Sequence, residues 1–481
     1  MITIRDVSFT YSGSETDGIR RINLEISKGE CILLCGRSGC GKTTLTRLIN
    51  GLIPAFYAGT LTGSVRIENQ DVAELPLYKI AQRVGSVFQN PRTQFFNVDT
   101  DSEIAFGIEN EGCPQERLIQ RVRQTAEELH IENLRGRNIF ELSGGEKQKI
   151  AFASVYAMNP DIYVLDEPSS NLDSESIAAL QSYIRNIKAQ GKTVVVAEHR
   201  LYYLTGIADK IVYMEKGEIA GVFTPAEFKS LSPETRHRMG LRAADLSEVR
   251  PDCALDAAAV QNGTAHERLE LELKNVSLYR KKKLVLQTLS FSARAGEIIA
   301  ITGANGAGKT TFVRALCGLH KETAGSFLWN GKGLKPKERL KRAYMVMQDV
   351  NYQLFAESVE AECSFGLKAV KAESVESALD ALHLSALRSR HPVSLSGGQK
   401  QRVAVAAGQV SGKPLLVFDE PTSGLDYDSM AQVSALIRSL AAHRIVFIVT
   451  HDYEFICKTC TRVLRFGETQ ILSDCPVGAE L

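Results

Sequence analysis

The alternation of hydrophobic and polar residues predicts strands and helices in the same order twice along the chain. Residues 2–11 and 269–279 alternate between apolar and polar positions, as half-buried strands do. The apolar runs at 162–165 and 193–197 have the composition of strands that helices cover on both faces. In each half, a largely apolar run also enters a glycine-rich segment and then a helical pattern (30–35 with 44–50, and 297–302 with 311–318). The pattern therefore indicates an α/β fold.

Composition places the chain among ordinary globular proteins. Its 481 residues are 44% hydrophobic and 23% charged, and such a length usually holds roughly two to four domains. Lys and Arg (57) nearly balance Asp and Glu (56), so the net charge of +1 excludes the global basic field of many nucleic-acid binders. The sequence contains no run approaching the roughly 18 apolar residues that would predict a membrane-spanning helix. Its first residues do not resemble a secretory signal. The ten cysteines have no disulfide-framework spacing, so we expect reduced thiols.

A long internal repeat explains the doubled pattern. A Gly-x-x-x-x-Gly-Lys-Thr segment occurs at 36–43 and at 303–310, which places its lysines 267 residues apart (42 to 309). Leu-Ser-Gly-Gly and an apolar run ending in Asp-Glu-Pro both recur after 253 residues (143 to 396 and 166 to 419). A repeat of this length is too long for a solenoid and predicts a tandem duplication of a whole domain. The first copy has 14 additional residues (267 against 253), which we expect in surface loops.

We expect one domain at 1–241 and a second at 269–481, joined by a linker at 242–268. Periodicity weakens after residue 241, and the next segment contains Pro251, three consecutive alanines and a Gln-Asn-Gly-Thr sequence. This composition is typical of a connecting segment. Its length allows two adjacent domains to pair.

The glycine-rich segment of each copy has the pattern of a phosphate-binding loop. It follows a predicted strand and precedes a predicted helix, which is the context that the motif requires. Its backbone N–H groups surround phosphate oxygens, its lysine reaches the β- and γ-phosphates, and its first threonine can ligate Mg²⁺. The residues expected to contact the nucleotide are Gly36, Ser38, Gly39, Gly41, Lys42, Thr43 and Thr44 in the first copy, and Gly303, Asn305, Gly306, Gly308, Lys309, Thr310 and Thr311 in the second.

An Asp-Glu pair at the end of a buried strand supplies the second half of such a site. Asp166 and Asp419 are placed to hold the Mg²⁺ shell. The next carboxylate, Glu167 or Glu420, is placed to polarise the attacking water as a general base. Asp-Glu-Pro alone often only ends a strand, but here four apolar residues precede it in both copies at the same distance from Ser-Gly-Gly. The sequence thus predicts two Mg²⁺-dependent sites of nucleotide hydrolysis.

Together these motifs resemble those of ATP-binding-cassette (ABC) ATPases over nearly all of both copies. In that family Leu-Ser-Gly-Gly is a signature segment, and here its serine lies 23 residues before the aspartate (143 to 166 and 396 to 419). The resemblance implies two tandem P-loop domains of α/β class, each with a mainly parallel core sheet, an antiparallel β subdomain and a helical subdomain. It also implies that ATP and Mg²⁺ bind.

The resemblance assigns roles to further residues of both copies. Signature residues that contact nucleotide are Ser143, Gly144, Gly145, Ser396, Gly397 and Gly398. The remaining matches are the Q-loop glutamines Gln89 and Gln348 (nucleotide and Mg²⁺), the catalytic switch histidines His199 and His451, the adenine-stacking Tyr11 and Tyr279, and the D-loops 171–173 and 424–426. The basic run 280–283 follows Tyr279, and a solvated turn is favoured there over a phosphate or lipid contact.

Members of the family pair their cassettes head to tail, so that each signature closes over the nucleotide of the other cassette. The resemblance therefore implies two sites formed between the fused copies, one combining Lys42 with Ser396 and the other Lys309 with Ser143. Both sites retain the catalytic motifs, so we expect both to hydrolyse ATP. Glu146 stands where glutamine is usual, and a charge near the γ-phosphate is expected to slow the second site.

The segment after each Q-loop glutamine resembles the ATPases of energy-coupling factor transporters. A second glutamine follows five residues later, at 94 and 353, and two apolar residues come next, at 95–96 and 354–355. The resemblance implies uptake of a vitamin or metal ion through separate chains, an integral-membrane coupling subunit and a substrate-binding membrane subunit. The chain itself is then peripheral, at the cytoplasmic face of the cell membrane. The two apolar pairs are expected to line a partly exposed groove for the coupling subunit, which is favoured over plain core packing.

Two other interpretations of the tandem cassettes remain open. The ATPase of another importer, of the sugar type, would be expected to have a degenerate signature or glutamate in one half. A non-transport ABC ATPase acting on ribosomes or nucleic acid would lose binding steeply with salt.

Overall fold

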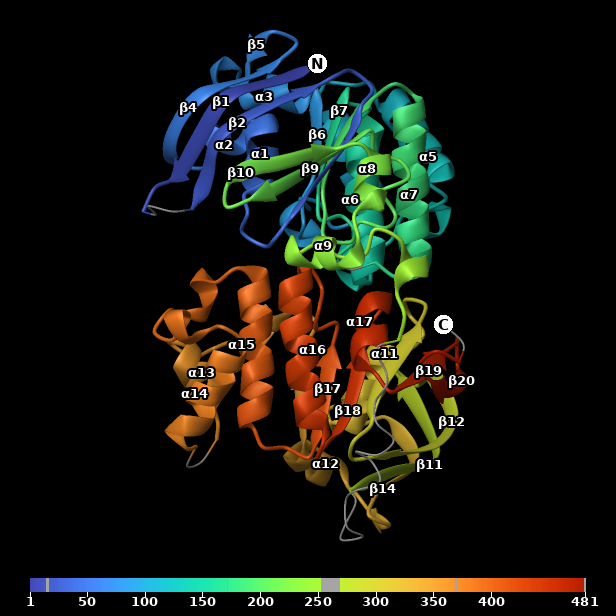
Figure 1. The fold of residues 1–481 in the computed structure, drawn as a ribbon. Helices are drawn as coiled ribbons and strands as arrows, with labels where there is room; N and C mark the ends of the chain where they lie inside the picture. The colour runs from blue at the N-terminus through green and yellow to red at the C-terminus, as the bar shows by residue number, and fades with distance from the viewer. Residues whose placement is uncertain (14–16, 171, 252–268, 368–369, 480–481) are drawn as a thin grey trace. The chain divides into compact units, whose positions relative to one another are not determined.

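The computed structural model describes residues 1–13, 17–170, 172–251, 269–367 and 370–479 (Figure 1). The chain forms two compact units, Met1–Asp245 and Leu246–Leu481. Most of the expected linker (252–268) and residue Asn171 of the first D-loop lie outside the described residues. Leu241 and Ala244 are buried in the core of the first unit. Each unit has its own hydrophobic core and both strands and helices, so the predicted tandem of α/β domains is confirmed.

A six-stranded sheet lies at the centre of the described part of the first unit, in the order β10-β9-β3-β8-β7-β6. Its strands pair in parallel except for β10, which is antiparallel to β9. Strand β8 separates β3 from β7, and the carboxyl ends of all three point to one edge of the sheet, where ligands bind in such folds. The bounds are β3 (Cys31–Gly36), β6 (Val84–Val87), β7 (Ile162–Asp166), β8 (Thr193–Ala197), β9 (Lys210–Glu215) and β10 (Glu218–Phe223).

An antiparallel sheet and a group of helices complete the first unit. The sheet has the order β2-β1-β4-β5, with bounds β1 (Ile2–Tyr11), β2 (Gly18–Ile26), β4 (Gly59–Ile67) and β5 (Gln70–Asp71). Helices α4, α5 and α6 pack on one another and correspond to the predicted helical subdomain. The helices are α1 (Lys42–Ile49), α2 (Leu52–Ala55), α3 (Leu77–Ala81), α4 (Thr100–Glu109), α5 (Gln115–Glu128), α6 (Gly144–Met158), α7 (Ser174–Ala189), α8 (Pro225–Ser230) and α9 (Pro233–Arg238).

The described part of the second unit repeats this topology. Its core sheet has the order β16-β17-β18-β13-β19-β20, and its antiparallel sheet the order β12-β11-β14-β15. The strands are β11 (Glu270–Arg280), β12 (Lys283–Arg294), β13 (Ile298–Gly303), β14 (Thr323–Trp329), β15 (Lys332–Gly333), β16 (Ala343–Val346), β17 (Leu415–Asp419), β18 (Ile445–Val449), β19 (Arg462–Phe466) and β20 (Ile471–Pro476). The helices are α11 (Lys309–Leu316), α12 (Pro336–Arg342), α13 (Val359–Ser364), α14 (Ala372–Ala381), α15 (Gly397–Val410), α16 (Tyr427–Ala441) and α17 (Tyr453–Thr459).

The additional residues of the first copy lie largely in helices, so the expectation that they form surface loops is wrong. Helices α4 and α5 have 10 and 14 residues, whereas α13 and α14 of the second unit have 6 and 10. The short helix α2, at 52–55, has no counterpart among the described helices of the second unit. The longer helix α5 still fits the fold because it is amphipathic and its apolar side packs on the core.

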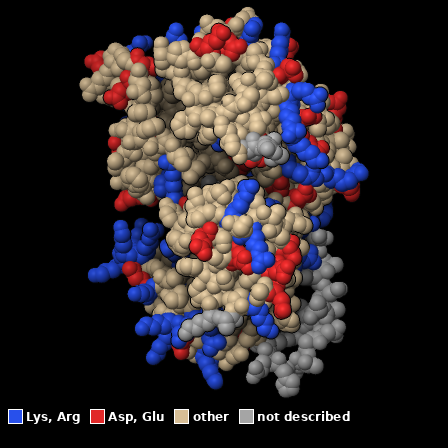
Figure 2. Space-filling view, turned by 90° about the vertical axis from the view of Figure 1, so that its left-hand side faces the viewer, with Lys and Arg blue, Asp and Glu red and all other residues tan. Residues whose placement is uncertain are grey.

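The surface and the thiols agree with the composition. The nine cysteines that the structure describes are free, and burial raises the pKa of the Cys31 thiol to about 12, so this thiol stays protonated. Both basic and acidic side chains occur on the face shown in Figure 2, with uncharged surface between them. Among the described helices, we find none whose length and apolar character would let it cross a bilayer.

Candidate active site

Each phosphate-binding loop connects a central strand to a helix, β3 to α1 and β13 to α11. The first glycine of the loop has a left-handed φ, 146° at Gly36 and 130° at Gly303. A Cβ atom on Gly36 would lie 2.2 Å from the carbonyl oxygen of Met214, and one on Gly303 would lie 2.3 Å from that of Phe466. Only glycine fits at these two positions, because the neighbouring strand backbone passes so close. The loop's exposed turn carries Ser38 and Gly39 in the first unit, and Asn305 and Gly306 in the second.

The loop lysine folds back over the loop that precedes it. The Lys42 ammonium group donates to the carbonyl oxygens of Gly36 (2.9 Å) and Arg37 (3.2 Å), and it lies 3.3 Å from Nε2 of His199. In the second unit, Lys309 donates in the same way to the carbonyl oxygens at 303 (2.6 Å) and 304 (3.0 Å). Both lysine side chains are therefore held at the start of a helix, where backbone N–H groups and the helix dipole also favour an anion.

Four of the residues expected to hold Mg²⁺, one threonine and one aspartate in each unit, lie in pairs at the end of the sheet. The Thr43 hydroxyl donates to Oδ1 of Asp166 at 3.3 Å, and the Thr310 hydroxyl donates to Oδ2 of Asp419 at 3.3 Å. Burial raises the pKa of both aspartates, that of Asp419 to about 6. Such a pair fits Mg²⁺, which takes one or two protein oxygens together with phosphate oxygens and water. Among the described residues there is no group of three or more acidic, His or Cys ligands.

The two glutamates proposed as general bases have an unusual backbone conformation. Glu167 and Glu420 both have left-handed φ values, 47° and 51°, which are uncommon for residues other than glycine. Their N–H groups donate to the next strand, to the carbonyl oxygens of Ala197 and Val449, both at 2.8 Å. The sheet thus fixes this conformation, and such strain in a fixed backbone is typical of functional sites.

In the first unit, the Q-loop and the histidine meet at the glutamate. The Gln89 amide donates to Oε2 of Glu167 at 2.7 Å, and Nε2 of His199 lies 3.5 Å from Oε1. Burial raises the pKa of Glu167 to about 8, although the Lys42 charge opposes the shift. In the second unit, Nε2 of His451 lies 3.9 Å from Oε1 of Glu420. Gln348 follows β16 just as Gln89 follows β6. Both units therefore bring the predicted histidine and glutamate together.

The signature serines cap helices in both units. Ser143 is the N-cap of α6 and Ser396 the N-cap of α15, and each forms a capping box with the third helical residue, Glu146 or Gln399. Gly144 with Gly145, and Gly397 with Gly398, form the first turns of these helices. The N–H donors of such a turn are available for an anion.

The predicted adenine-stacking tyrosines have different surroundings. The Tyr11 hydroxyl lies 3.1 Å from Oγ1 of Thr44 and accepts a hydrogen bond from Arg47 at 3.0 Å. The Arg47 guanidinium also lies 4.0 Å from the centre of the Tyr57 ring, a cation–π contact. Sequence reasoning did not identify Arg47 or Tyr57, although Tyr57 lies in one of the segments where the first copy is longer.

The backbone of Tyr279 is fixed by neighbouring residues. Its carbonyl oxygen lies 2.7 Å from Nε2 of His320. In the basic run that follows, Lys281 and Lys282 form the two-residue turn between β11 and β12, both with positive φ and both exposed. This geometry is that of a solvated hairpin turn, as the sequence predicts for the basic run.

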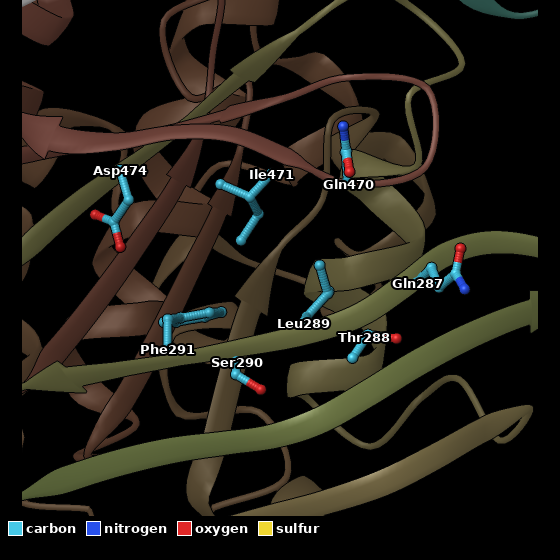
Figure 3. Close-up of a pocket in the computed structure, with 8 residues that line it drawn as sticks. All are labelled: Gln287, Thr288, Leu289, Ser290, Phe291, Gln470, Ile471 and Asp474. Atoms are coloured by element: carbon cyan, nitrogen blue, oxygen red, sulfur yellow. The ribbon is translucent and has the colours of Figure 1, made fainter.

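A cavity lies in each unit among the described residues. The first, of about 450 Å³, contains Thr43 and Asp166 in its wall and extends to Gln89 and the aromatic residues Phe56 and Tyr57. The second, of about 380 Å³, lies between β12 and β20 (Figure 3). Its residues are Gln287, Thr288, Leu289, Ser290, Phe291, Gln470, Ile471 and Asp474. This second cavity contains none of the predicted nucleotide residues, and its Asp474 is paired with Arg462 at 2.5 Å.

Comparison with known proteins decides the family. The sequence pattern of the family described as ABC transporter matches residues 19–170 and 286–423, one match in each unit. The chain belongs to the ABC transporter family. It is a tandem ABC ATPase, and proteins of this kind bind ATP, generally with Mg²⁺, and hydrolyse it.

Relatives of this ABC ATPase match it over nearly its whole length. A Treponema denticola protein named as an ABC transporter ATP-binding protein is 50% identical over 475 residues, covering 98% of this chain and 97% of its own. A Bacillus subtilis protein, YkoD, which is named as an HMP/thiamine import ATP-binding protein, is 31% identical over 499 residues, covering 98% of this chain and 91% of its own. Among solved structures, a ribosome-bound archaeal Pelota and ABCE1 complex aligns with a TM-score of 0.72 at 21% identity, over 98% of this chain and 78% of the other. That likeness is one of fold.

Proposed function

We propose that this ABC ATPase is the ATP-hydrolysing subunit of an energy-coupling factor type importer. It would work at the cytoplasmic face of the cell membrane, docked on an integral-membrane coupling subunit that engages a substrate-binding membrane subunit. A vitamin or a metal ion is the class of substrate. The relative named as an HMP/thiamine import protein supports this class. The observation that carries the proposal is that each unit has an exposed phenylalanine, Phe96 or Phe355, on a backbone fixed in the same way.

The segment after each Q-loop is held at its start by a glutamine. The Gln94 side chain accepts from the N–H of Phe88 (3.2 Å) and donates to the carbonyl oxygen of Ser86 (3.2 Å). Gln353 accepts from the N–H of Met347 (3.0 Å) and donates to the carbonyl oxygen of residue 345 (2.9 Å). The glutamine found five residues after each Q-loop glutamine thus ties the segment to the edge strand, β6 or β16.

A buried glutamate holds the other end of the segment. Glu103 accepts from the N–H groups of Phe96 (3.0 Å) and Asn97 (2.8 Å). In the second unit, Glu362 accepts from the N–H groups of Phe355 and residue 356, both at 2.7 Å. Hydrogen bonds to a carboxylate are strong when they are buried. The backbone of both segments is therefore fixed before any partner binds, which lowers the entropy cost of docking.

Within each predicted apolar pair, the first side chain packs inward, half-buried at Phe95 and buried at Leu354, and the second is exposed. Phe95 packs against the core with part of its ring still exposed, and Leu354 is part of the core, so the expectation that both members of each pair line a partly exposed groove is wrong for Leu354. Phe96 is 74% exposed and stacks on Phe106, with ring centres 4.9 Å apart, and Phe355 is 68% exposed. Exposed aromatic side chains on fixed backbone are typical anchors of protein interfaces.

The cavity of the first unit offers a route from partner to nucleotide. Thr43, Asp166 and Gln89, which we assign to the nucleotide, line it together with the exposed Phe56. A partner helix that pressed on this region would move Gln89 and, through the 2.7 Å hydrogen bond, Glu167. The reverse path lets ATP binding and hydrolysis act on the membrane subunits.

The chemistry assigns one task to each group of the site. The lysine ammonium and the loop N–H groups bind the phosphates and neutralise charge, and the glutamate orients the attacking water and accepts its proton. The histidine holds the glutamate and the γ-phosphate in place. Mg²⁺ on the threonine and aspartate oxygens would stabilise charge that develops on the phosphate oxygens. Following the family resemblance, we include in this proposal that the signature serine of each cassette completes the nucleotide site of the other.

Co-purification tests the docking assignment. The full chain, tagged and produced in its own cells, is purified in mild detergent, and the membrane proteins that accompany it are identified by mass spectrometry. We expect an integral-membrane coupling subunit and a substrate-binding subunit, and we expect F96A with F355A to reduce their recovery about tenfold, as loss of interface anchors does. The control V222A with L472A removes exposed apolar side chains from β10 and β20, at the opposite edge of the sheet.

Two results would contradict the proposal. Equal recovery of the membrane subunits with F96A and F355A would place docking elsewhere. Salt-sensitive sedimentation with ribosomes, without membrane subunits, would favour the non-transport ABC ATPase instead.

A further inference from the structure

A buried carboxylate next to the switch histidine joins two loops of the first unit. Glu198, immediately after β8, is only 2% exposed. Its Oε1 accepts from the N–H groups of His199 (2.7 Å) and Arg200 (3.1 Å). Its Oε2 accepts from the N–H of Ser169 (3.3 Å) and from the hydroxyl of Tyr203 (2.9 Å). Ser169 belongs to the loop between β7 and α7 that begins with the catalytic glutamate, so one side chain connects the histidine loop to the glutamate loop.

The second unit has threonine at the corresponding position and places its carboxylate on the other side of the histidine. Asp452 follows His451, is 3% exposed, and accepts from the Thr422 hydroxyl at 2.8 Å and the Phe455 N–H at 3.2 Å. Thr422 lies three residues after the strand aspartate, just as Ser169 does in the first unit. In both units a buried carboxylate therefore reaches the corresponding loop. In the first unit this carboxylate precedes the histidine in sequence, and in the second unit it follows the histidine.

The position of Asp452 is occupied in the first unit by a residue of opposite charge. The Arg200 guanidinium is buried and lies 3.4 Å from the carbonyl oxygen of Ser169 and 3.5 Å from that of Leu172. The first unit thus has Glu-His-Arg where the second has Thr-His-Asp. Each sequence supplies one buried carboxylate to the loop, and buried carboxylates are costly unless such donors compensate them.

Thr450, which stands in the second unit where the first unit has Glu198, also contacts Glu420 directly. The Thr450 hydroxyl donates to Oε2 of Glu420 at 3.3 Å and accepts from the N–H of Asp452 at 3.1 Å. A carboxylate at position 198 has no proton to donate to Glu167 in this way, and there the Gln89 amide makes the contact at 2.7 Å. The two glutamates are therefore oriented by different donors.

We propose that Glu198 and Asp452 are positioning residues that fix the histidine loop against the glutamate loop in their respective units. The inference rests on the proposed roles of the two glutamates and two histidines. It requires only that a carboxylate reach Ser169 or Thr422, not that it stand at one particular place in the sequence. Transferring the carboxylate across the histidine should then preserve function.

The experiment transfers the second unit's arrangement into the first. In the full chain with E420Q, which leaves Glu167 as the base, E198T is expected to lower kcat for ATP about tenfold or more, because several buried donors lose their acceptor. The KM for ATP should stay within about twofold, since Glu198 contacts no predicted nucleotide ligand except through His199. Adding R200D to E198T should restore kcat to within about threefold, although R200D alone should lower it. R200D would then lower kcat by itself but raise it in the E198T background. Two substitutions that damage the structure independently do not show such coupling.

The reciprocal exchange covers the case in which E198T does not fold. In the chain with E167Q, D452N should lower kcat, and T450E with D452R should restore it relative to D452R alone. Thermal unfolding and ATP binding by equilibrium dialysis are measured for every variant. An unchanged kcat in E198T would overturn the positioning role. A double exchange that stays as inactive as the single variants, with normal folding and ATP binding, would overturn the transfer of the carboxylate.

A failure of the underlying assignments gives a different result. If E167Q with E420Q keeps full hydrolysis, the two glutamates are not the bases. The effect of E198T, R200D and their combination on total turnover then tests the connection between the loops without that assumption.

Discussion

The Arg137 guanidinium lies 2.7 Å from the Glu146 carboxylate, at the start of the signature helix of the first unit. Glu146 also accepts from the N–H of Ser143 at 2.8 Å, the contact that Gln399 makes with Ser396 at 2.9 Å in the second unit. Although burial opposes it, the hydrogen bonds with Ser143 and Arg137 lower the pKa of Glu146. The carboxylate is thus ionised, engaged in the capping box and compensated by an adjacent positive charge.

This geometry predicts a small effect of E146Q. Because the glutamine makes the same capping contact and the glutamate charge is already paired, ATP turnover of the full chain should change by no more than about twofold, on the scale of a partly exposed ion pair. R137A leaves the charge uncompensated near the signature and should lower turnover more than E146Q does. Steady-state phosphate release measures both. A severalfold increase in E146Q would support the sequence-based expectation that the charge slows one site.

The second prediction concerns the two glutamates. E167Q with E420Q should lower ATP turnover at least a hundredfold, because an amide cannot accept the proton of the attacking water. ATP binding should persist, since the lysines and loop N–H groups are unchanged. Single-turnover hydrolysis and binding of a fluorescent ATP analogue distinguish these steps. The single variants E167Q and E420Q serve as controls, and rapid turnover in the double variant would show that another group activates water.

Removal of Mg²⁺ is the third test. Chelation by EDTA should abolish hydrolysis, and added Mg²⁺ should restore it. The reason is that the ion, which the two Thr–Asp oxygen pairs would hold, neutralises the charge of the phosphates. T43A with T310A should raise the Mg²⁺ concentration needed for half-maximal turnover, whereas T43S with T310S, which keeps the hydroxyls, should change it little. An unchanged Mg²⁺ requirement in the alanine variants would remove these threonines from the metal site.

The fourth prediction is a pH dependence of stability in the nucleotide-free chain. Burial raises the pKa of Glu167 to about 8 from an ordinary value near 4.5. The folded state therefore prefers the protonated acid, and it loses stability relative to the unfolded state as pH rises from about 4.5 through about 8. E167Q carries no such charge, so its melting temperature should exceed that of the unsubstituted chain by more at pH 9 than at pH 6. Calorimetry at the two pH values checks this, and a constant difference would contradict the raised pKa.

The sequence by itself determined the duplication, the fold class and the family. These follow from local patterns: glycine spacing around Lys42 and Lys309, apolar runs ending in Asp-Glu, and serines that begin a helix. Such signals are readable because phosphate-loop geometry, strand burial and helix capping depend on neighbouring residues along the chain. The predicted strands at 2–11 and 162–165 match β1 and β7 to within a residue, and the helix expected at 44–50 begins two residues earlier, at Lys42.

Only the tertiary structure decided which chemically similar residues do different things. Phe95 is packed on the core while Phe96 is exposed, because the Gln94 and Glu103 contacts fix the backbone between them. Glu146 is compensated by an arginine nine residues away.

Glu198 precedes its histidine and Asp452 follows its own, yet each reaches the corresponding loop of its unit. Aligning the two copies by motif spacing would not reveal this. Contacts of this kind join residues about 30 positions apart in the chain. They depend on side-chain reach and burial, which a linear pattern does not contain.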